Sequence, residues 1–272
     1  MCYFISTELL YLSVFTSPIG SYRICPLLYQ KSFGTNLPLP FLFDGGFREH
    51  LGNIEFLELL LEDEVQRRAN KRLINRVAQA HFEELKTFET FDFAFNPKIP
   101  ARQIMDLATC QFIERKEWAL LIGPVGVGKS HLIQALGHQA CRMGYKVLYT
   151  KTSRLLADLG GGHADGTWEK RIRRYLKPDL LLLDDFAMKE FTPQQAEDIY
   201  ELIDECSRHG SLGVASNRSP QDWYPLFPNP VLAEGALDRL INKAHHVMLT
   251  GKSYRPQLRP DRSKQESFLI QR

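Results

Sequence analysis

The stretch Gly123-Pro124-Val125-Gly126-Val127-Gly128-Lys129-Ser130 decides how this chain can fold. It matches the pattern G-x-x-x-x-G-K-[ST] in full. It stands between an apolar run, residues 118–123, and residues 131–143, which have the periodicity of a helix. An ordinary tight turn with a solvated lysine and serine is the alternative. Because eight residues and both flanks agree, the pattern favours a phosphate-binding loop.

Each part of this loop has a role in holding a nucleotide. Glycines allow tight wrapping and bring backbone N–H groups against phosphate oxygens, and the next helix directs its positive end at them. Lys129 is predicted to reach the β- and γ-phosphates, and the Ser130 hydroxyl to bind Mg²⁺. The expected cofactors are therefore ATP and Mg²⁺. The predicted nucleotide-binding residues are Gly123, Pro124, Val125, Gly126, Val127, Gly128, Lys129, Ser130 and His131.

Two acids follow an apolar run that reads as a strand buried on both faces, residues 179–183. Such a strand delivers its last residues to the carboxyl edge of the sheet, where α/β proteins bind ligands. Asp184 is predicted to hold Mg²⁺ through water, and Asp185 to orient or deprotonate the attacking water. A helix cap or a solvated strand end is the alternative interpretation.

Three further residues are candidates for contact with the nucleotide. Asn217 follows another predicted strand and is expected to hydrogen-bond the γ-phosphate or the water; an Asx-turn is the alternative. Arg239, on a predicted helix, is a candidate arginine finger for a neighbouring subunit. Its alternative is a surface ion pair with Asp238 or Glu234. Arg255 is a candidate for the nucleotide of its own chain.

Strands and helices alternate along the rest of the chain. This alternation predicts an α/β fold with a parallel sheet and helices on both faces. An amphipathic helix of about 25 residues is expected from residue 54, because apolar residues recur at four-residue steps. The predicted elements are a linker at 88–95 that is packed by its aromatic side chains, helices at 100–115, 131–143, 153–159, 168–176, 193–209 and 235–243, and strands at 118–123, 145–150, 179–183, 212–216 and 246–249.

Composition narrows the class of protein. The 272 residues are 44% hydrophobic and 24% charged, which is typical of a soluble globular chain and excludes collagenous, disulfide-scaffold and disordered classes. Residues 1–48 differ from the rest because they are rich in aromatics and poor in charge. We predict an atypical, irregular segment at 1–48, a helical domain and linker at 49–95, an ATPase core at 96–255 and a basic tail at 256–272.

The cysteines and the apolar segments bear on location. The five cysteines are odd in number and scattered, without zinc spacing, so we expect free thiols in a reducing compartment. The apolar segment at residues 3–15 lacks the basic start of a signal peptide, and it is too short to span a membrane. We therefore expect a cytoplasmic protein with no membrane partner.

Basic residues gather in three places although the net charge is only +2. Residues 67–76 hold five with no acid among them, residues 170–177 hold five with only Glu169 nearby, and the tail from residue 252 holds six. A solvated helix face is the ordinary interpretation of each segment taken singly. Three together favour duplex DNA, contacted at its phosphate backbone, because no base-reading motif accompanies them.

Beyond these motifs, residues 56–254 resemble the IstB-like ATP-binding proteins, helper ATPases of insertion-sequence transposition. These belong to the AAA+ class and are close to the DnaC helicase loaders. The resemblance implies an AAA+ fold, ATP-dependent assembly on DNA, and a transposase partner. It also implies the phosphate-loop, metal, water and sensor roles of Lys129, Ser130, Asp184, Asp185 and Asn217. The segments that carry it are FLELLLEDEVQRRANKRL, FEELKTFETFDF, FIERKEWALLIGPVGVGKSHLIQALG, ADGTWEKRIRRYLKPDLLLLDDF, QQAEDIYELIDE, ASNRSPQDWY and FPNPVLAEGALDRLINKAHHVMLTGKSYR.

Some features depart from the family pattern or leave a choice open. The general AAA+ class has Glu at the second acid, whereas Asp185 agrees with the DnaC-like branch. Residues 1–48 match no part of the family, and a misassigned start or an upstream frame disruption is one hypothesis for them. A DnaC-like helicase loader is the alternative function, and a small-molecule kinase is a third. The phosphate loop is common to all three.

Overall fold

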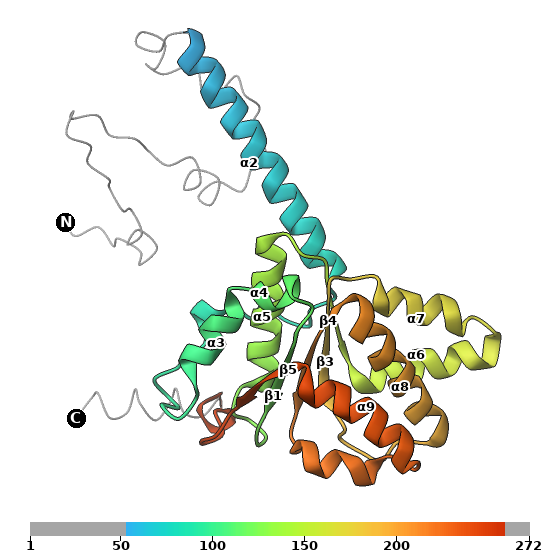
Figure 1. The fold of residues 1–272 in the computed structure, drawn as a ribbon. Coiled ribbons are helices and arrows are strands. Elements are labelled where there is room, and N and C mark those ends of the chain that lie inside the picture. Colours follow the sequence, from blue (N-terminus) through green and yellow to red (C-terminus); the bar gives the residue numbers. More distant parts are fainter. Residues whose placement is uncertain (1–52, 259–272) are drawn as a thin grey trace, which may run out of the picture. The chain divides into compact units, whose positions relative to one another are not determined.

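The computed structural model describes residues 53–258 (Figure 1). The chain divides into two compact units, residues 1–70 and residues 71–272. The predicted domain limits at 48, 95 and 255 stay predictions. The atypical segment 1–48 and most of the basic tail lie outside the described residues.

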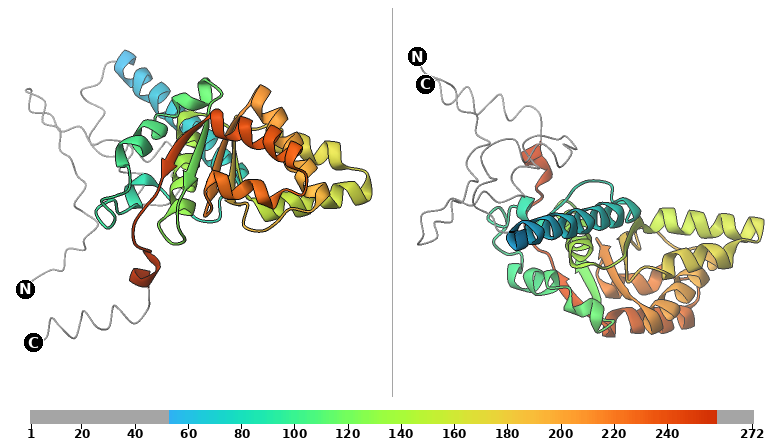
Figure 2. Two further views of the ribbon diagram at one scale, coloured as in Figure 1. Left: turned by 60° about the horizontal axis from the view of Figure 1, so that its bottom comes forward. Right: turned by 90° about the horizontal axis from the view of Figure 1, so that it is seen from above.

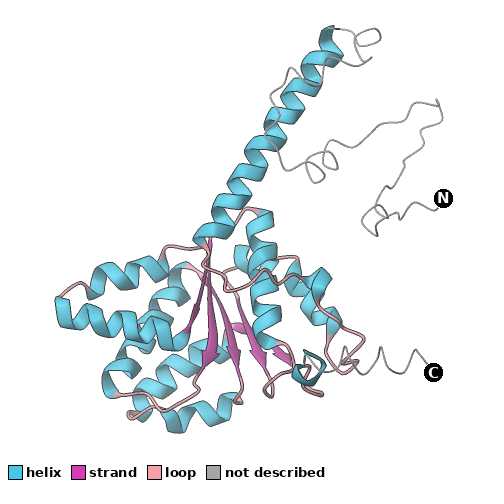
Figure 3. Ribbon diagram, turned by 180° about the vertical axis from the view of Figure 1, so that it is seen from behind, coloured by secondary structure: helices cyan, strands magenta, loops and turns pink. Residues whose placement is uncertain are grey.

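A five-stranded sheet forms the centre of the second unit. Its order is β2-β3-β4-β1-β5 and every neighbouring pair is parallel, which confirms the predicted parallel sheet (Figure 3). Because β1 pairs with β4 and β3 lies next to β4, the carboxyl ends of these three strands meet at one edge. The strands are β1 (Trp118–Ile122), β2 (Val147–Lys151), β3 (Leu180–Phe186), β4 (Ser211–Ser216) and β5 (Ala244–Met248).

Helices cover both faces of this sheet (Figure 2). Alternate residues of β1 enter different clusters of the core: Leu120 belongs to the cluster that includes residues of α6, α7, α8 and α9, whereas Leu121 belongs to the one that includes residues of α3, α4 and α5. This period of two is the pattern of a strand buried on both sides. The helices are α2 (Asn53–Gln79), α3 (Ala101–Ala108), α4 (Gln111–Glu114), α5 (Lys129–Met143), α6 (Thr152–Asp165), α7 (Trp168–Leu176), α8 (Pro193–His209) and α9 (Pro230–Asn242); the 3₁₀ turns are η3 (Phe88–Thr90), η4 (Pro220–Leu226) and η5 (Arg255–Leu258).

The amphipathic helix α2 is confirmed, but its apolar residues differ in environment. Leu57, Leu61 and Val65, in its first half, are exposed. Leu73 and Val77, near its end, pack against the core of the second unit. The four-residue repeat therefore predicts the helix and not the extent of its burial.

Two predicted helices have the wrong extent. The helix expected at 100–115 is broken into α3 and α4, because Cys110 adopts a left-handed backbone with φ 58°. Helix α6 continues through Gly160–Gly162 instead of ending at residue 159. The reason is close packing: a Cβ on Gly162 would lie 2.8 Å from the Trp168 Cα, so glycine lets α7 approach.

Two boundaries of other elements also move. Strand β3 runs on through both acids to Phe186, with an irregular register against β4 after Leu183. Helix α9 begins at Pro230 instead of at residue 235. Its start is capped by the Asn229 side chain, which accepts a hydrogen bond from the Val231 N–H. The predicted cap of α8, by Thr192 and Gln195, is confirmed.

The described cysteines are free thiols, as expected. Cys110, Cys141 and Cys206 are all buried. Burial raises the pKa of Cys110 and of Cys141 to about 11, and that of Cys206 to about 12. Within residues 53–258, no helix has both the length and the apolar content that crossing a membrane requires.

Candidate nucleotide-binding site

The glycine-rich loop links the end of β1 to the start of α5. Gly126 and Gly128 have φ of 84° and 104°, values that L side chains rarely adopt, so glycine is required at both positions. Lys129 opens α5 and is 7% exposed, and its Nζ donates to the Pro124 carbonyl oxygen at 2.8 Å. Burial lowers the pKa of Lys129, while the negative charges of Asp184 and Asp185 oppose that change. The loop thus holds a buried cation beside two acids.

Two segments far from the loop in sequence lie against it. A Cβ on Gly128 would stand 2.6 Å from the Phe91 ring, and one on Gly126 would stand 2.1 Å from the Ser253 Oγ. The Tyr254 N–H also donates to the Gly126 carbonyl at 2.8 Å. The linker around Phe91 and the segment around Ser253 therefore enclose the phosphate loop.

The linker and the C-terminal segment are also joined to each other. The Asn96 side chain donates to the Lys252 carbonyl at 2.8 Å and accepts from the Lys252 N–H at 3.0 Å. The rings of Phe95 and Tyr254 meet edge to face, with centroids 4.9 Å apart. The positive charge of Arg255 contributes to lowering the pKa of Lys129, so this predicted residue lies on the same side as the loop. Sequence reasoning predicted a linker packed by its aromatics but missed Asn96.

The two acids stand side by side at the carboxyl edge of β3. Asp184 is 1% exposed. Its Oδ2 accepts from the Tyr149 hydroxyl at 3.0 Å and its Oδ1 from the Asp185 N–H at 2.9 Å. Asp185 adopts φ 54°, a left-handed backbone that is uncommon for aspartate in a strand. Burial, followed by the charge of Asp184, raises the pKa of Asp185. A carboxyl group of raised pKa is a stronger proton acceptor.

These residues fit a magnesium ion. Mg²⁺ prefers oxygen ligands and is usually held by one or two carboxylates together with water and substrate phosphates. A buried carboxylate at Asp184 and an exposed hydroxyl at Ser130 are donors of this type. Across residues 53–258 there is no group of three or more His, Cys, Asp or Glu side chains that could hold a metal alone. Phosphate oxygens would therefore have to complete the coordination.

Asn217 and His131 have neighbours that bear on their predicted roles. Asn217 follows Ser216, which pairs with Ile122 at the end of β1, so Asn217 lies on the edge that carries the loop. Its Nδ2 contacts the Met188 sulfur at 3.0 Å. The His131 ring instead faces the linker, with Nε2 2.9 Å from the Thr87 carbonyl. Burial lowers the pKa of His131. Their contacts with a nucleotide stay predictions.

Arg239 lies at the other end of the sheet. It is in the last turn of α9, one turn before Lys243, whose carbonyl accepts from the N–H of Trp118 at the start of β1. The phosphate loop follows the opposite end of that strand. Arg239 pairs with Asp204 of α8 at 3.3 Å and lies over the Tyr200 ring, instead of pairing with the acids near it in sequence. Arg239 therefore lies away from the phosphate loop of its own chain.

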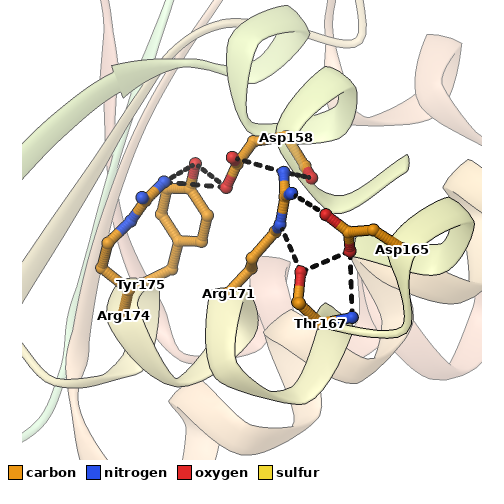
Figure 4. A network of polar contacts seen from close by, with 6 residues as sticks. All are labelled: Asp158, Asp165, Thr167, Arg171, Arg174 and Tyr175. Atoms are coloured by element: carbon orange, nitrogen blue, oxygen red, sulfur yellow. Dashed lines mark hydrogen bonds and ion pairs between the residues drawn. The ribbon is translucent and has the colours of Figure 1, made fainter. Parts of the chain in front are cut away.

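The basic segment 170–177 is partly neutralised by acids that the local sequence does not show (Figure 4). Arg171 pairs with Asp158 at 3.0 Å and with Asp165 at 2.5 Å, and Arg174 pairs with Asp158 at 2.7 Å. The expectation that only Glu169 lies nearby is therefore wrong. These acids stand on α6, which packs antiparallel to α7.

The cations that remain on α7 face solvent. Arg173 pairs with Glu169, but both side chains are more than three-quarters exposed. Lys170 and Lys177 form no ion pair with any described residue. A hollow of about 570 Å³ lies at the start of α7, where Lys170 and Arg173 share its wall with His163 and Trp168. The exposed positive charge of this segment is thus concentrated on three side chains.

The positive charge of segment 67–76 is also partly neutralised by an acid outside that segment. Glu64, one turn before it, pairs with Arg67 at 2.7 Å and with Arg68 at 2.6 Å. Arg76 donates to the Cys141 carbonyl at 3.1 Å. Lys71 and Arg72 form no ion pair with any described residue. Three of the five basic side chains therefore have no carboxylate partner within residues 53–258, and of these Lys71 and Arg72 are exposed.

Known proteins similar to this chain come from insertion sequences. The family model described as IstB-like ATP binding protein matches residues 44–262. An insertion-sequence ATP-binding protein of Mycobacterium tuberculosis is 52% identical over 214 residues, 78% of this chain and 85% of that protein. The IS21 ATP-binding protein of Pseudomonas aeruginosa is 32% identical, over 79% of this chain and 81% of its own length.

Solved structures with the same fold come from replication proteins. DnaA from Aquifex aeolicus, bound to AMPPCP, matches 64% of this chain and 53% of its own, with a TM-score of 0.53 and 20% identity. The DnaC helicase loader matches 64% of this chain and 99% of its own, with a TM-score of 0.51 and 18% identity. At these identities the likeness shows the fold alone, which is the AAA+ fold expected from the sequence.

Proposed function

Because this chain belongs to the family of IstB-like ATP-binding proteins, we propose that it is a Mg²⁺-dependent ATPase that binds duplex DNA and assists a transposase. One observation carries the hydrolytic part of this proposal. The buried cation of Lys129 and the carboxylates of Asp184 and Asp185 converge where β1 and β3 end. A phosphate-binding loop beside paired acids is suited to cleaving a phosphoanhydride with water.

The chain's own residues account for most of the proposed reaction. Backbone N–H groups of the loop and the Lys129 ammonium hold the phosphates, and Asn217 orients the attacking water. Asp185 accepts the proton that this water loses as its oxygen bonds to the γ-phosphorus and the bond to the leaving ADP oxygen breaks. When bound by Ser130 and Asp184, Mg²⁺ would offset the negative charge of the phosphates.

DNA contact is assigned to exposed cations that form no ion pair or, for Arg173, only a solvent-exposed one. Lys170, Arg173 and Lys177 of α7 are the primary candidates, and Lys71 and Arg72 of α2 extend the set. Exposed lysine and arginine side chains bind phosphate without reading base sequence. The hollow beside Lys170 and Arg173 is wide enough for a phosphate group and its neighbouring sugar.

We assign to Arg239 the contact with the nucleotide of a neighbouring copy of the chain. Because this side chain stands at the opposite end of the sheet from the loop of its own chain, its arginine-finger role requires a neighbouring copy. The pair with Asp204 and the Tyr200 ring would hold the guanidinium ready for that contact. We therefore expect ATP-dependent assembly of several copies along DNA.

The test is the ATPase rate of the wild type with and without duplex DNA, at two salt concentrations, beside Lys129→Ala. We expect Mg²⁺-dependent turnover, stimulation by duplex that fades with salt, and no turnover in the variant. Stimulation by a replicative helicase, with none by DNA or transposase, would favour the helicase-loader alternative. Full turnover by Lys129→Ala would refute the site.

A further inference from the structure

Tyr149 lies in β2, next to β3, with its hydroxyl at the buried end of the site. Its ring is 2% exposed, and its Oη donates to Asp184 Oδ2 at 3.0 Å. In the register of the two strands Tyr149 pairs with Leu182, two residues before Asp184. Residues i and i+2 of a strand point to the same face, so Leu182 and Asp184 share the side toward which Tyr149 reaches.

The carboxylate of Asp184 depends on this hydroxyl. A buried charge that is not hydrogen-bonded is strongly unfavourable. Among the described residues, Tyr149 is the single side chain that donates to the Asp184 carboxylate; the other donor to that carboxylate is the Asp185 backbone N–H. The Thr152 hydroxyl donates to the Asp184 backbone carbonyl instead, at 3.0 Å. The two bonds to the carboxylate approach different oxygens, so together they fix its plane. Each oxygen keeps a second lone pair.

We infer that Tyr149 is a positioning residue for Mg²⁺: its hydroxyl holds the Asp184 carboxylate in the orientation that ligates the cation or its water. The inference rests on the proposed function of Asp184. Groups that hydrogen-bond to a metal ligand orient it and tune its affinity, and their loss typically lowers metal affinity or activity by about 10–100-fold.

Residues 80–82, which directly follow α2, contact Tyr149 and hold it in place. The Tyr149 N–H donates to the Ala80 carbonyl at 2.8 Å, directly after α2. The Phe82 ring is tilted against the Tyr149 ring at 6.2 Å and stacks on His138 at 4.0 Å. A Cβ on Gly137 would stand 2.6 Å from Phe82, so the glycine makes room for it. Residues 80–82 therefore contact the residue whose hydroxyl reaches Asp184.

The test is Tyr149→Phe, which removes one oxygen and keeps the ring. We expect the Mg²⁺ concentration for half-maximal ATPase to rise about 10–100-fold. Mn²⁺ affinity in the presence of ADP, measured by electron paramagnetic resonance, should fall by a similar factor. ADP affinity in EDTA should not change, because the phosphate loop is untouched.

A matched control is Tyr145→Phe. The Tyr145 hydroxyl donates to Glu114 at 3.0 Å. Tyr145 lies before the start of β2, whereas the two acids lie at the carboxyl end of β3, so the loss of this hydroxyl should leave Mn²⁺ affinity unchanged. Phe82→Leu, which loosens the packing on the Tyr149 ring but keeps the hydroxyl, should lower Mn²⁺ affinity by a smaller factor. It also serves as the test should Tyr149→Phe not fold.

The outcomes separate this inference from the function on which it rests. Wild-type protein without Mg²⁺-dependent hydrolysis would refute the proposed function. A wild type that hydrolyses ATP, together with a folded Tyr149→Phe variant of unchanged Mn²⁺ affinity and Mg²⁺ requirement, would refute the positioning role alone. If Tyr149→Phe does not fold, unchanged Mn²⁺ affinity in Phe82→Leu has the same consequence.

Discussion

Removing the three exposed cations of α7 should change how DNA affinity depends on salt. The perturbation is the triple substitution Lys170→Ala, Arg173→Ala and Lys177→Ala. None of these side chains carries the internal network of Figure 4, which belongs to Arg171 and Arg174. The fold should therefore survive, and the change should fall on the contact with phosphate.

The magnitude follows from counting the contacts. Each neutralised phosphate contributes about 0.9 to the slope of log affinity against log salt, so three lost contacts lower that slope by about 2.7. When the salt concentration rises fourfold, the factor by which DNA affinity falls should be roughly 40 times larger for the wild type than for the variant. The loss should not depend on base sequence, because these contacts are to the backbone.

The assay is fluorescence anisotropy with a labelled duplex at four or more salt concentrations. Arg208→Ala is the matched control, because Arg208 is held by Asp204 and Glu205 on α8 and its loss should leave the slope unchanged. A folded triple variant with the wild-type slope would show that α7 does not contact DNA. A slope lowered by about 0.9 in Arg208→Ala, one third of the change expected for the triple variant, would show that only net charge matters.

Three further expectations concern catalysis and stability. Asp185→Asn should lower the ATPase rate by about 10²–10⁴-fold, the usual contribution of a general base; single-turnover kinetics measure it, and an unchanged rate would remove Asp185 from the mechanism. Arg239→Ala should lower DNA-stimulated turnover by ~10³–10⁵-fold if it completes a neighbour's site, and mixing it with Lys129→Ala should restore activity in trans. Burial lowers the pKa of His138, so the unfolded chain takes up protons more readily as pH falls below 6.5. The fold should therefore lose stability in that range, and melting curves should show a smaller loss for His138→Gln.

The sequence predicts most of the fold because its signals are local. Phosphate loop, strands and helix ends each depend on a few neighbouring residues, such as the cap formed by Thr192 and Gln195. The errors arise where a distant contact decides the backbone. Gly162 would weaken an isolated helix, yet in α6 it permits the contact with Trp168. No pattern within α6 alone contains that information.

Charge is harder to predict than secondary structure for the same reason. Few acids lie near Arg171 and Arg174 in the sequence. The turn between α6 and α7 nevertheless brings two acids of α6, Asp158 and Asp165, against them. A run of basic residues therefore overstates the charge that a partner meets. Pairing in the folded chain leaves fewer cations, and these are the ones that an experiment should remove.

The enclosure of the phosphate loop could not be predicted from any motif. It requires Asn96 to meet Lys252, residues separated by more than half of the chain. The signal in the sequence is weak because a single Asn before a Pro is common in turns. The aromatic linker was predicted to be packed, and Phe91 does lie against Gly128. Its position at the loop depends on the strand order, which sequence alone leaves open.

Burial of opposite charges links the candidate site to the stability of the fold. Lys129 and Asp184 are both almost inaccessible, and a buried charge whose partner is removed is strongly destabilising. The charge of Asp184 favours the protonated form of Lys129 against the effect of burial. Removing either side chain therefore leaves an uncompensated charge in the core, and loss of turnover by itself cannot separate a chemical role from a loosened site. Tyr149 offers that separation, because its hydroxyl carries no charge and its removal leaves both ions in place.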